Sequence, residues 1–221
     1  MAADRRARYR RGAMFAQRLL PVVVLEDVSW ALPLTEALLK AGLDVVEITL
    51  RTDAALAGMR AIRGEFGDVK IGAGTVLDAE VVPQLRDLGV DFAVSPGLNA
   101  QVAAAARAAG MPLLPGVATA TDIEAARAWG FDMLKFFPAE PLGGARMLKA
   151  LIGPYRHLGM RFVPTGGIDL TTAPDYARLP EVAAVGGSWF VAPPLLRAGR
   201  WGEVTEKARA AVAAMLGDGA R

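Results

Sequence analysis

The 221-residue sequence contains no cysteine and a single histidine, His157. Without cysteine, the chain has no disulfide bonds, no thiol catalysis and no cysteine-ligated metal. One histidine also excludes metal sites that need two histidines from the same chain. A Ser-His-Asp triad would have to use His157, but the Gly-x-Ser-x-Gly elbow typical of such serines is missing. We therefore expect no metal site and no cofactor.

Long hydrophobic runs and a large net charge are lacking as well. No stretch approaches the roughly 20 apolar residues of a membrane span, and the formal net charge of +2 is too small to indicate a nucleic-acid or membrane partner. Gln17 and Arg18 interrupt the apolar run at 14–20, so a signal peptide is not expected. We predict a cytoplasmic protein that binds neither nucleic acid nor membrane. A nucleic-acid arm formed by the five arginines of residues 1–11 is the less favoured alternative.

Lysine is scarce: the chain has five lysines beside twenty arginines. Lys135 lies inside the apolar run at 133–138, where a charged amine is costly. Burial favours the neutral amine, which is a nucleophile, whereas arginine stays protonated. Lys135 is therefore a candidate for covalent chemistry. The alternative is a lysine with a buried stem whose ammonium group reaches solvent.

Short apolar, β-prone runs alternate with segments of helical periodicity along the chain. The eight predicted strands lie at 21–25, 44–50, 70–76, 92–96, 111–117, 133–138, 161–166 and 182–190. Helices are predicted at 32–41, 54–65, 79–88, 100–109, 122–129, 145–152 and 201–216. This alternation predicts an α/β fold, a single (β/α)8 barrel. An open doubly wound sheet is the alternative, but no Gly-x-Gly-x-x-Gly turn follows the first strand.

Local signals predict where helices and domains begin and end. The sequence Thr121-Asp122-Ile123-Glu124 has the pattern of a capping box before the helix at 122–129. Glycines that favour helix C-termini follow four of the helical runs, at Gly42, Gly89, Gly110 and Gly130. No low-complexity linker interrupts the chain, so we expect one barrel domain over 1–221. Residues 1–18 are expected to form a basic N-terminal helix or tail.

Polar residues at the ends of the predicted strands mark a candidate site, because barrel active sites lie at the carboxyl ends of the strands. Glu47, Thr49 and Arg51 alternate along the second strand and should share its inner face. The arginine fork suits a carboxylate. A structural ion pair that closes the barrel is the alternative interpretation.

Other strand ends carry glycine, hydroxyl and proline groups. Thr75 ends the third strand after Gly72 and Gly74, which permit close approach of backbone or ligand, and Pro96 ends the fourth. After the seventh strand and within the eighth, Gly166, Gly167, Gly187 and Ser188 stand where such barrels commonly bind phosphate. Tight packing at the barrel rim is the alternative for these glycines.

The orientation of Lys135 connects these features. Leu134 and Phe136 flank it on the opposite face of the sixth strand, so alternation should point Lys135 inward, toward Glu47. An inward lysine, a carboxylate, an arginine and a phosphate loop together favour Schiff-base chemistry on a phosphorylated keto acid. The amine would attack the ketone, and the carboxylate would move protons.

The chain resembles the 2-keto-3-deoxy-6-phosphogluconate (KDPG) and 4-hydroxy-2-oxoglutarate (KHG) aldolase family. The resembling segments run in order over nearly the whole chain, at 46–52, 72–77, 92–98, 135–140, 164–168 and 186–189. The resemblance implies a class I aldolase with a TIM-barrel fold, usually a homotrimer. It would cleave KDPG to pyruvate and glyceraldehyde 3-phosphate, or KHG to pyruvate and glyoxylate.

The resemblance also implies roles for individual residues. By its motif, Lys135 is similar to the Schiff-base lysine, and Glu47 to the general acid/base. Arg51 matches the carboxylate binder, with Thr75 and Pro96 as contacts to the pyruvate half. The phosphate cradle would comprise Gly166, Gly167, Gly187 and Ser188.

Three alternative functions remain open from the sequence. The first is an aldolase for the galactonate epimer of KDPG. The second is a phosphate-barrel isomerase or epimerase, which would need acid and base groups but no Schiff-base lysine. The third is a non-catalytic phosphosugar-binding protein, which would tolerate arginine in place of Lys135.

Overall fold

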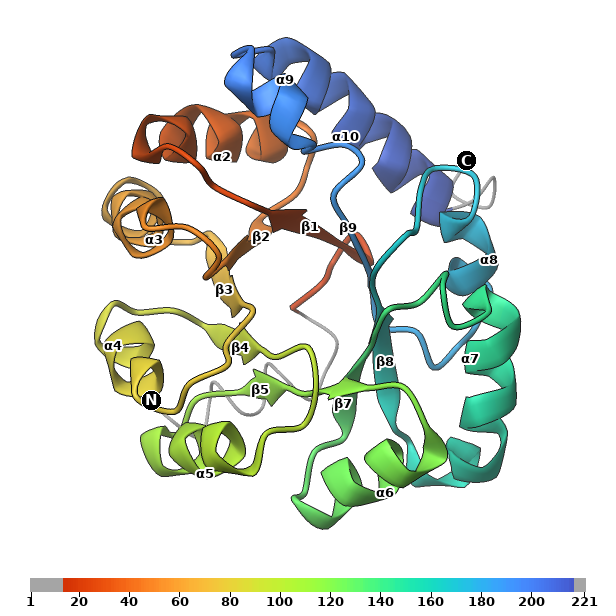
Figure 1. Cartoon of the computed structure of the whole chain (residues 1–221). Coiled ribbons are helices and arrows are strands. Elements are labelled where there is room, and N and C mark those ends of the chain that lie inside the picture. The colour runs from red at the N-terminus through yellow and green to blue at the C-terminus, as the bar shows by residue number, and fades with distance from the viewer. Residues whose placement is uncertain (1–13, 217–221) are drawn as a thin grey trace.

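The computed structural model describes residues 14–216, in which parallel strands form the centre and helices an outer ring (Figure 1). Each strand lies within a predicted run, except that the first begins two residues before its run. The strands are β1 (Leu19–Val23), β2 (Val45–Thr49), β3 (Lys70–Gly74), β4 (Phe92–Val94), β5 (Leu113–Leu114), β6 (Gly116–Val117), β7 (Met133–Phe136), β8 (Arg161–Pro164) and β9 (Val185–Gly187).

The strands close into a barrel. β5 and β6 are two halves of one strand position, separated by Pro115, which has no amide N–H to donate. β5 pairs with β4, and β6 pairs with β7. β1 pairs with both β2 and β9, and the bridges Phe162↔Val182 and Thr165↔Gly186 complete the ring. Pairing between the first and last strands confirms the (β/α)8 barrel and excludes the open doubly wound sheet.

Helices follow the strands as predicted, with four short additions. The predicted helices are α2 (Ala31–Lys40), α3 (Ala54–Glu65), α4 (Val81–Asp87), α5 (Ala100–Ala109), α6 (Ala120–Ala128), α7 (Gly144–Ile152) and α10 (Trp201–Leu216). Two five-residue helices, α8 (Ala173–Ala177) and α9 (Pro193–Arg197), were not predicted, and neither were the 3-10 turns η1 (Val28–Trp30) and η2 (Gly153–Leu158). Segments this short carry too few residues to display a helical period.

The helix ends confirm the glycine signals and correct the capping box. All four predicted glycines have positive φ, between 63° and 85°. The box before α6 is formed by Thr119 and Asp122: the Asp122 amide donates to Thr119 Oγ1, and the Thr119 amide donates to the Asp122 carboxylate. The prediction from Thr121 to Glu124 was therefore wrong by two residues, because the shorter aspartate side chain closes the same box.

Apolar side chains fill the amino-terminal end of the barrel. One cluster inside the barrel contains Met14, Phe15, Phe92, Leu114 and Met133, together with other inward residues. The rings of Phe15 and Phe92 meet edge to face, with centroids 6.0 Å apart. Because this end is closed by apolar packing, the polar interior groups lie toward the carboxyl ends of the strands.

The predicted N-terminal helix or tail of residues 1–18 lies mostly outside the described residues. Met14–Arg18 form a turn and not a helix, because the buried Met14 and Phe15 lead the chain into the barrel. Over residues 14–216, no helix is long and apolar enough to cross a membrane.

Candidate active site

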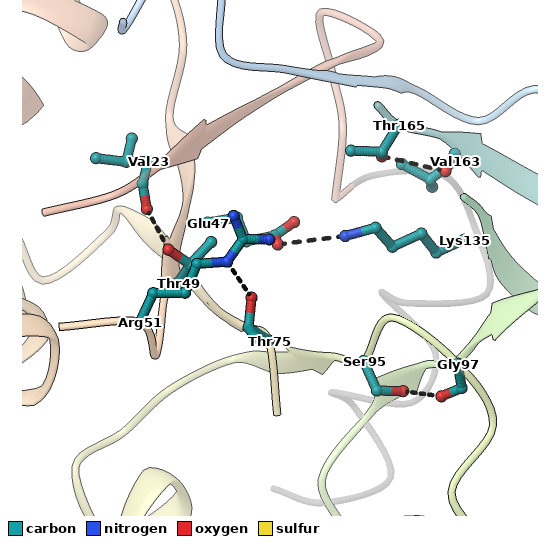
Figure 2. A network of polar contacts seen from close by, with 10 residues as sticks. All are labelled: Val23, Glu47, Thr49, Arg51, Thr75, Ser95, Gly97, Lys135, Val163 and Thr165. Atoms are coloured by element: carbon teal, nitrogen blue, oxygen red, sulfur yellow. Dashed lines mark hydrogen bonds and ion pairs between the residues drawn. The ribbon is translucent and has the colours of Figure 1, made fainter. Parts of the chain in front are cut away.

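Lys135 and Glu47 meet inside the barrel. Lys135 Nζ, from β7, lies 3.7 Å from Glu47 Oε1, from β2, and the two side chains are 7% and 1% exposed (Figure 2). The structure thus confirms that alternation points Lys135 inward. Within the described chain, neither carboxylate oxygen of Glu47 has a hydrogen-bond partner. Burying a carboxylate without hydrogen bonds costs free energy. The two oxygens of Glu47 are therefore available to exchange a proton with a bound molecule.

Glycines on β3 make room for the interior side chains. A Cβ on Gly74 would lie 2.1 Å from Glu47 Oε1, and a Cβ on Gly72 would lie 2.4 Å from the ring of Phe92. Both distances are far below any normal contact, so neither position accepts a side chain without a shift. The sequence predicted close approach of backbone or ligand here. What approaches is the side chain of the neighbouring strand.

Arg51 and Thr75 form a pair at the rim. Arg51 Nε donates to Thr75 Oγ1 at 3.0 Å (Figure 2). Thr75 has a φ of 58°, an uncommon backbone conformation for a β-branched residue. Arg51 is exposed at the rim, so it is not buried inside the barrel as Glu47 is. β2 ends at Thr49, and the Arg51 amide turns back to donate to the Thr49 carbonyl, so strand alternation no longer applies.

Thr49 is buried, but its hydroxyl is not directed to a ligand. Thr49 Oγ1 donates to the Val23 carbonyl of β1 at 3.0 Å. The hydroxyl of Thr49 therefore links β1 to β2. Glu47, Thr49 and Arg51 were predicted to face one cavity, but Thr49 does not offer its hydroxyl to it. Alternation identified the correct face of the strand but could not identify the partner on it.

Pro96 is brought to the strand next to Lys135. A Cβ on Gly116 would lie 2.0 Å from the Pro96 carbonyl oxygen, and Gly116 on β6 is paired with Lys135 on β7. The preceding Ser95 donates from Oγ to the Gly97 carbonyl at 2.7 Å, which fixes this turn. The Pro96 turn thus lies against the strand that neighbours the lysine.

The two glycine-rich segments lie side by side at the end of β8 and β9. The bridge between Thr165 and Gly186 joins them. Gly166 and Gly167 have φ values of 103° and 80°, which L-residues with a side chain rarely adopt. A Cβ on Gly187 would lie 1.7 Å from the Trp189 ring, so tight packing accounts for this glycine, while Ser188 is exposed. The structure brings together the four residues predicted to hold phosphate.

Two residues near Lys135 were missed from the sequence. Lys135 Nζ lies 5.1 Å from the centroid of the Phe137 ring, a cation–π distance. Thr165 is 6% exposed, and Figure 2 shows it close to Val163 beside Lys135. Its Oγ1 would be 2.3 Å from a Cβ on Gly186. Residues two positions apart on a strand share a face. Phe137 follows Lys135 by two residues, and Thr165 follows Val163 by two residues, so this spacing could have indicated both.

Elsewhere in residues 14–216, the structure places no group of three or more His, Asp or Glu side chains close enough to hold a metal ion. A cavity of about 290 Å³ opens at the opposite end of the barrel, where β5 and β7 begin. Arg107 stacks over Trp129 in its wall. None of the predicted site residues lines this cavity.

Comparison with known proteins identifies close relatives. The family model "KDPG and KHG aldolase" matches residues 12–207. A 2-dehydro-3-deoxy-phosphogluconate aldolase of Treponema pallidum is 47% identical over 188 residues, which are 85% of this chain and 89% of that protein.

Solved structures agree with the sequence comparison. The KDPG aldolase of Legionella pneumophila, with pyruvate captured as a covalent carbinolamine, has a TM-score of 0.87 at 38% identity, covering 91% of this chain and 98% of that one. The corresponding aldolase of Zymomonas mobilis, solved with 3-phosphoglycerate, has a TM-score of 0.85 at 41% identity, covering 93% and 96%. Fold and sequence are thus shared over nearly the full length of each chain.

Proposed function

Because the chain belongs to the KDPG and KHG aldolase family, we propose that it cleaves KDPG through a Schiff base on Lys135. The protein is an aldolase, a carbon–carbon lyase. The products are pyruvate and glyceraldehyde 3-phosphate. The observation that carries the assignment of residues is the buried pair of Lys135 and Glu47, 3.7 Å apart inside the barrel.

Lys135 is the nucleophile in this mechanism. Its neutral amine adds to the C2 carbonyl of the keto acid to give a carbinolamine, and loss of water leaves an iminium. Removal of the C4 hydroxyl proton then breaks the C3–C4 bond. C4 leaves as the aldehyde of glyceraldehyde 3-phosphate, and the bonding electrons form an enamine at C3. The Legionella relative with pyruvate as a covalent carbinolamine supports the first step.

Glu47 is the proton carrier. Its carboxylate is placed to accept a proton as the C3–C4 bond breaks and to return one to C3 of the enamine. Hydrolysis of the resulting iminium releases pyruvate and restores the amine. The two unpartnered oxygens of Glu47 support this role, since no hydrogen bond within the described chain holds them away from substrate.

Arg51, Thr75 and Pro96 are the proposed contacts to the pyruvate half. Thr75 accepts the Nε hydrogen bond of Arg51. Within the described chain the two terminal nitrogens of Arg51 have no partner, so they are free to grip a carboxylate in bidentate fashion. The Pro96 turn lies beside the strand of Lys135, where the pyruvate carbons would be attached.

Gly166, Gly167, Gly187 and Ser188 are the proposed phosphate cradle. Their adjacent backbone turns at the ends of β8 and β9 match the common phosphate position of barrels of this type. The Zymomonas relative was solved with 3-phosphoglycerate, a phosphorylated acid. A cradle of this kind favours KDPG over KHG, which has no phosphate. Values of kcat/KM for KDPG, its galactonate epimer and KHG decide the preference.

The resemblance alone leads us to infer a cytoplasmic homotrimer. Light scattering of the purified protein tests the oligomeric state, and cell fractionation tests the location.

The deciding experiment is borohydride trapping in the presence of pyruvate, followed by intact mass and peptide mapping. A reduced pyruvate adduct on Lys135 is expected. If a folded sample forms no adduct, the Schiff-base mechanism is wrong, and an isomerase or epimerase without a covalent lysine becomes the better hypothesis.

A further inference from the structure

Glu140 lies in the turn between β7 and α7, five residues after Lys135, and contacts the turn that follows β8. The Glu140 amide donates to the Gly166 carbonyl at 2.9 Å, and the preceding Ala139 amide donates to the Thr165 carbonyl at 2.8 Å. Backbone hydrogen bonds therefore join the segment that follows β7 to the segment that begins the proposed phosphate cradle.

The Gly166–Gly167 turn rests directly on this segment. A Cβ on Gly167 would lie 2.8 Å from Glu140 Cβ, and a Cβ on Gly166 would lie 3.1 Å from the Phe137 ring. The conformation and the contacts of the turn thus both depend on residues 137–140. A displacement of Glu140 would displace the glycine turn with it.

The side chain of Glu140 reaches beyond the turn to α8. Tyr176 Oη donates to Glu140 Oε1 at 2.5 Å, and Tyr176 is 1% exposed. Burial, followed by the bond to the carboxylate, raises the pKa of this phenol. The hydroxyl therefore remains a donor throughout the neutral range. Glu140 therefore binds two segments. Its backbone amide holds the Gly166–Gly167 turn, and its carboxylate holds α8.

We propose that Glu140 and Tyr176 are positioning residues, which hold the Gly166–Gly167 turn in place for the phosphate of the substrate. This inference rests on the proposed function, in which that turn is part of the phosphate cradle. The bonds of this pair involve neither Lys135 nor its carboxylate partner Glu47, and the pair acts through the backbone of the turn. Its removal should therefore weaken binding of phosphorylated substrate and leave Schiff-base formation unchanged.

The test compares Tyr176→Phe with wild type on KDPG and on KHG. For KDPG, KM should rise about tenfold, the equivalent of one hydrogen bond to a charged group, with kcat little changed. For KHG, kcat/KM should stay at the wild-type value because this substrate carries no phosphate. The rate of borohydride trapping with pyruvate should also be unchanged.

Two further variants sharpen the test. Glu140→Gln keeps an oxygen acceptor for the phenol, so the rise in KM for KDPG should be smaller than in Tyr176→Phe. Tyr155→Phe is the matched control, because it removes a tyrosine–glutamate bond of 3.1 Å, to Glu124, away from the glycine turn. This control should behave as wild type on both substrates.

An unchanged KM for KDPG in Tyr176→Phe would overturn the inference, and so would an equal loss on KDPG and KHG, which indicates a merely structural role. If circular dichroism finds Tyr176→Phe unfolded, the same comparison is decided with Glu140→Gln. Failure of the proposed function has a different signature, since wild type itself would then form no pyruvate adduct and cleave neither substrate. That result would overturn the inference as well.

Discussion

The carboxylate of Glu47 fills the space that a side chain at position 74 would need. A Cβ on Gly74 would lie 2.1 Å from Glu47 Oε1 and 2.8 Å from its carboxyl carbon. The two residues belong to neighbouring strands, β2 and β3, whose register places Gly74 opposite Thr49. The glycine therefore belongs to the geometry that sets Glu47 beside Lys135.

The substitution Gly74→Ala should displace the Glu47 carboxylate from its place beside Lys135. We expect kcat for KDPG to fall toward the roughly 10²-fold loss typical of a removed acid or base group, while pyruvate still forms an adduct on Lys135. Gly64→Ala is the control, because a Cβ there meets no atom within 4 Å. Wild-type turnover in folded Gly74→Ala would show that the carboxylate position is not critical.

Lys135→Arg should abolish both turnover and pyruvate trapping. Arginine keeps the positive charge but stays protonated, so it cannot form the Schiff base. The control is Lys149→Arg, an exposed position on α7, which should leave both activities intact. Aldolase activity in Lys135→Arg, measured by pyruvate release, would contradict the covalent mechanism.

Glu47→Gln keeps the shape of the side chain and removes its capacity to carry a proton. We expect kcat to fall about 10²–10⁴-fold, with pyruvate trapping partly retained, because the lysine is still present. Single-turnover measurements separate the two steps. If kcat matches that of wild type, Glu47 has only a structural role in the barrel.

Arg51→Lys should weaken binding of the keto acid. Lysine retains the charge but loses both the Nε bond to Thr75 and the bidentate fork. We expect KM for KDPG to rise about tenfold, as for one charged hydrogen bond, and the pyruvate concentration for half-maximal trapping to rise in parallel. Arg60→Lys, an exposed position on α3, is the control. An unchanged KM would exclude Arg51 as the carboxylate contact.

The hydrogen bond from Tyr176 to Glu140 should also contribute to the free energy of unfolding. Tyr176→Phe leaves the carboxylate without its buried donor, so we expect the free energy of unfolding to fall by about 1–3 kcal/mol. The pKa of Tyr176 is raised in the folded state, so its contribution is fully present below the ordinary tyrosine value of about 10 and is lost as the pH rises above it. Urea unfolding of both proteins between pH 6 and 11 should give a constant difference to about pH 10 and a smaller one above. A difference that shrinks below pH 9 would exclude this assignment.

Much of the fold could be predicted because its signals are local. Parallel strands buried on both faces read as continuous apolar runs, and these located every strand with ends that differ by at most three residues. The family resemblance, confirmed by the comparisons, agreed with the same pattern. The failures were also local in origin. The turn at Met14–Arg18, the two short helices and the capping box at Thr119 depend on a few residues whose patterns fit more than one structure.

The candidate site shows the same division. Alternation along β7 correctly predicted an inward Lys135. Alternation along β2 was less reliable, because the Thr49 hydroxyl bonds to Val23 and Arg51 lies beyond the end of the strand. Phe137 lies two residues after Lys135, and Thr165 lies two residues after Val163. This spacing is consistent with a position near the lysine, but the sequence gives no distance between the side chains. Period-two alternation assigns a face to a side chain and gives no information about what lies across that face.

The chemistry available to this protein follows from its residues alone: a rare lysine in an apolar strand, an acid on another strand, and no cysteine. The order of strands and helices also follows from the sequence, because hydrophobic periodicity is a property of neighbouring residues. The folded chain is needed to show that Lys135 and Glu47 lie 3.7 Å apart, that Gly74 leaves room for the acid, and that Glu140 links the turn after β7 to α8. These relationships depend on strand register and barrel closure, which join residues distant in sequence, so no local pattern encodes them.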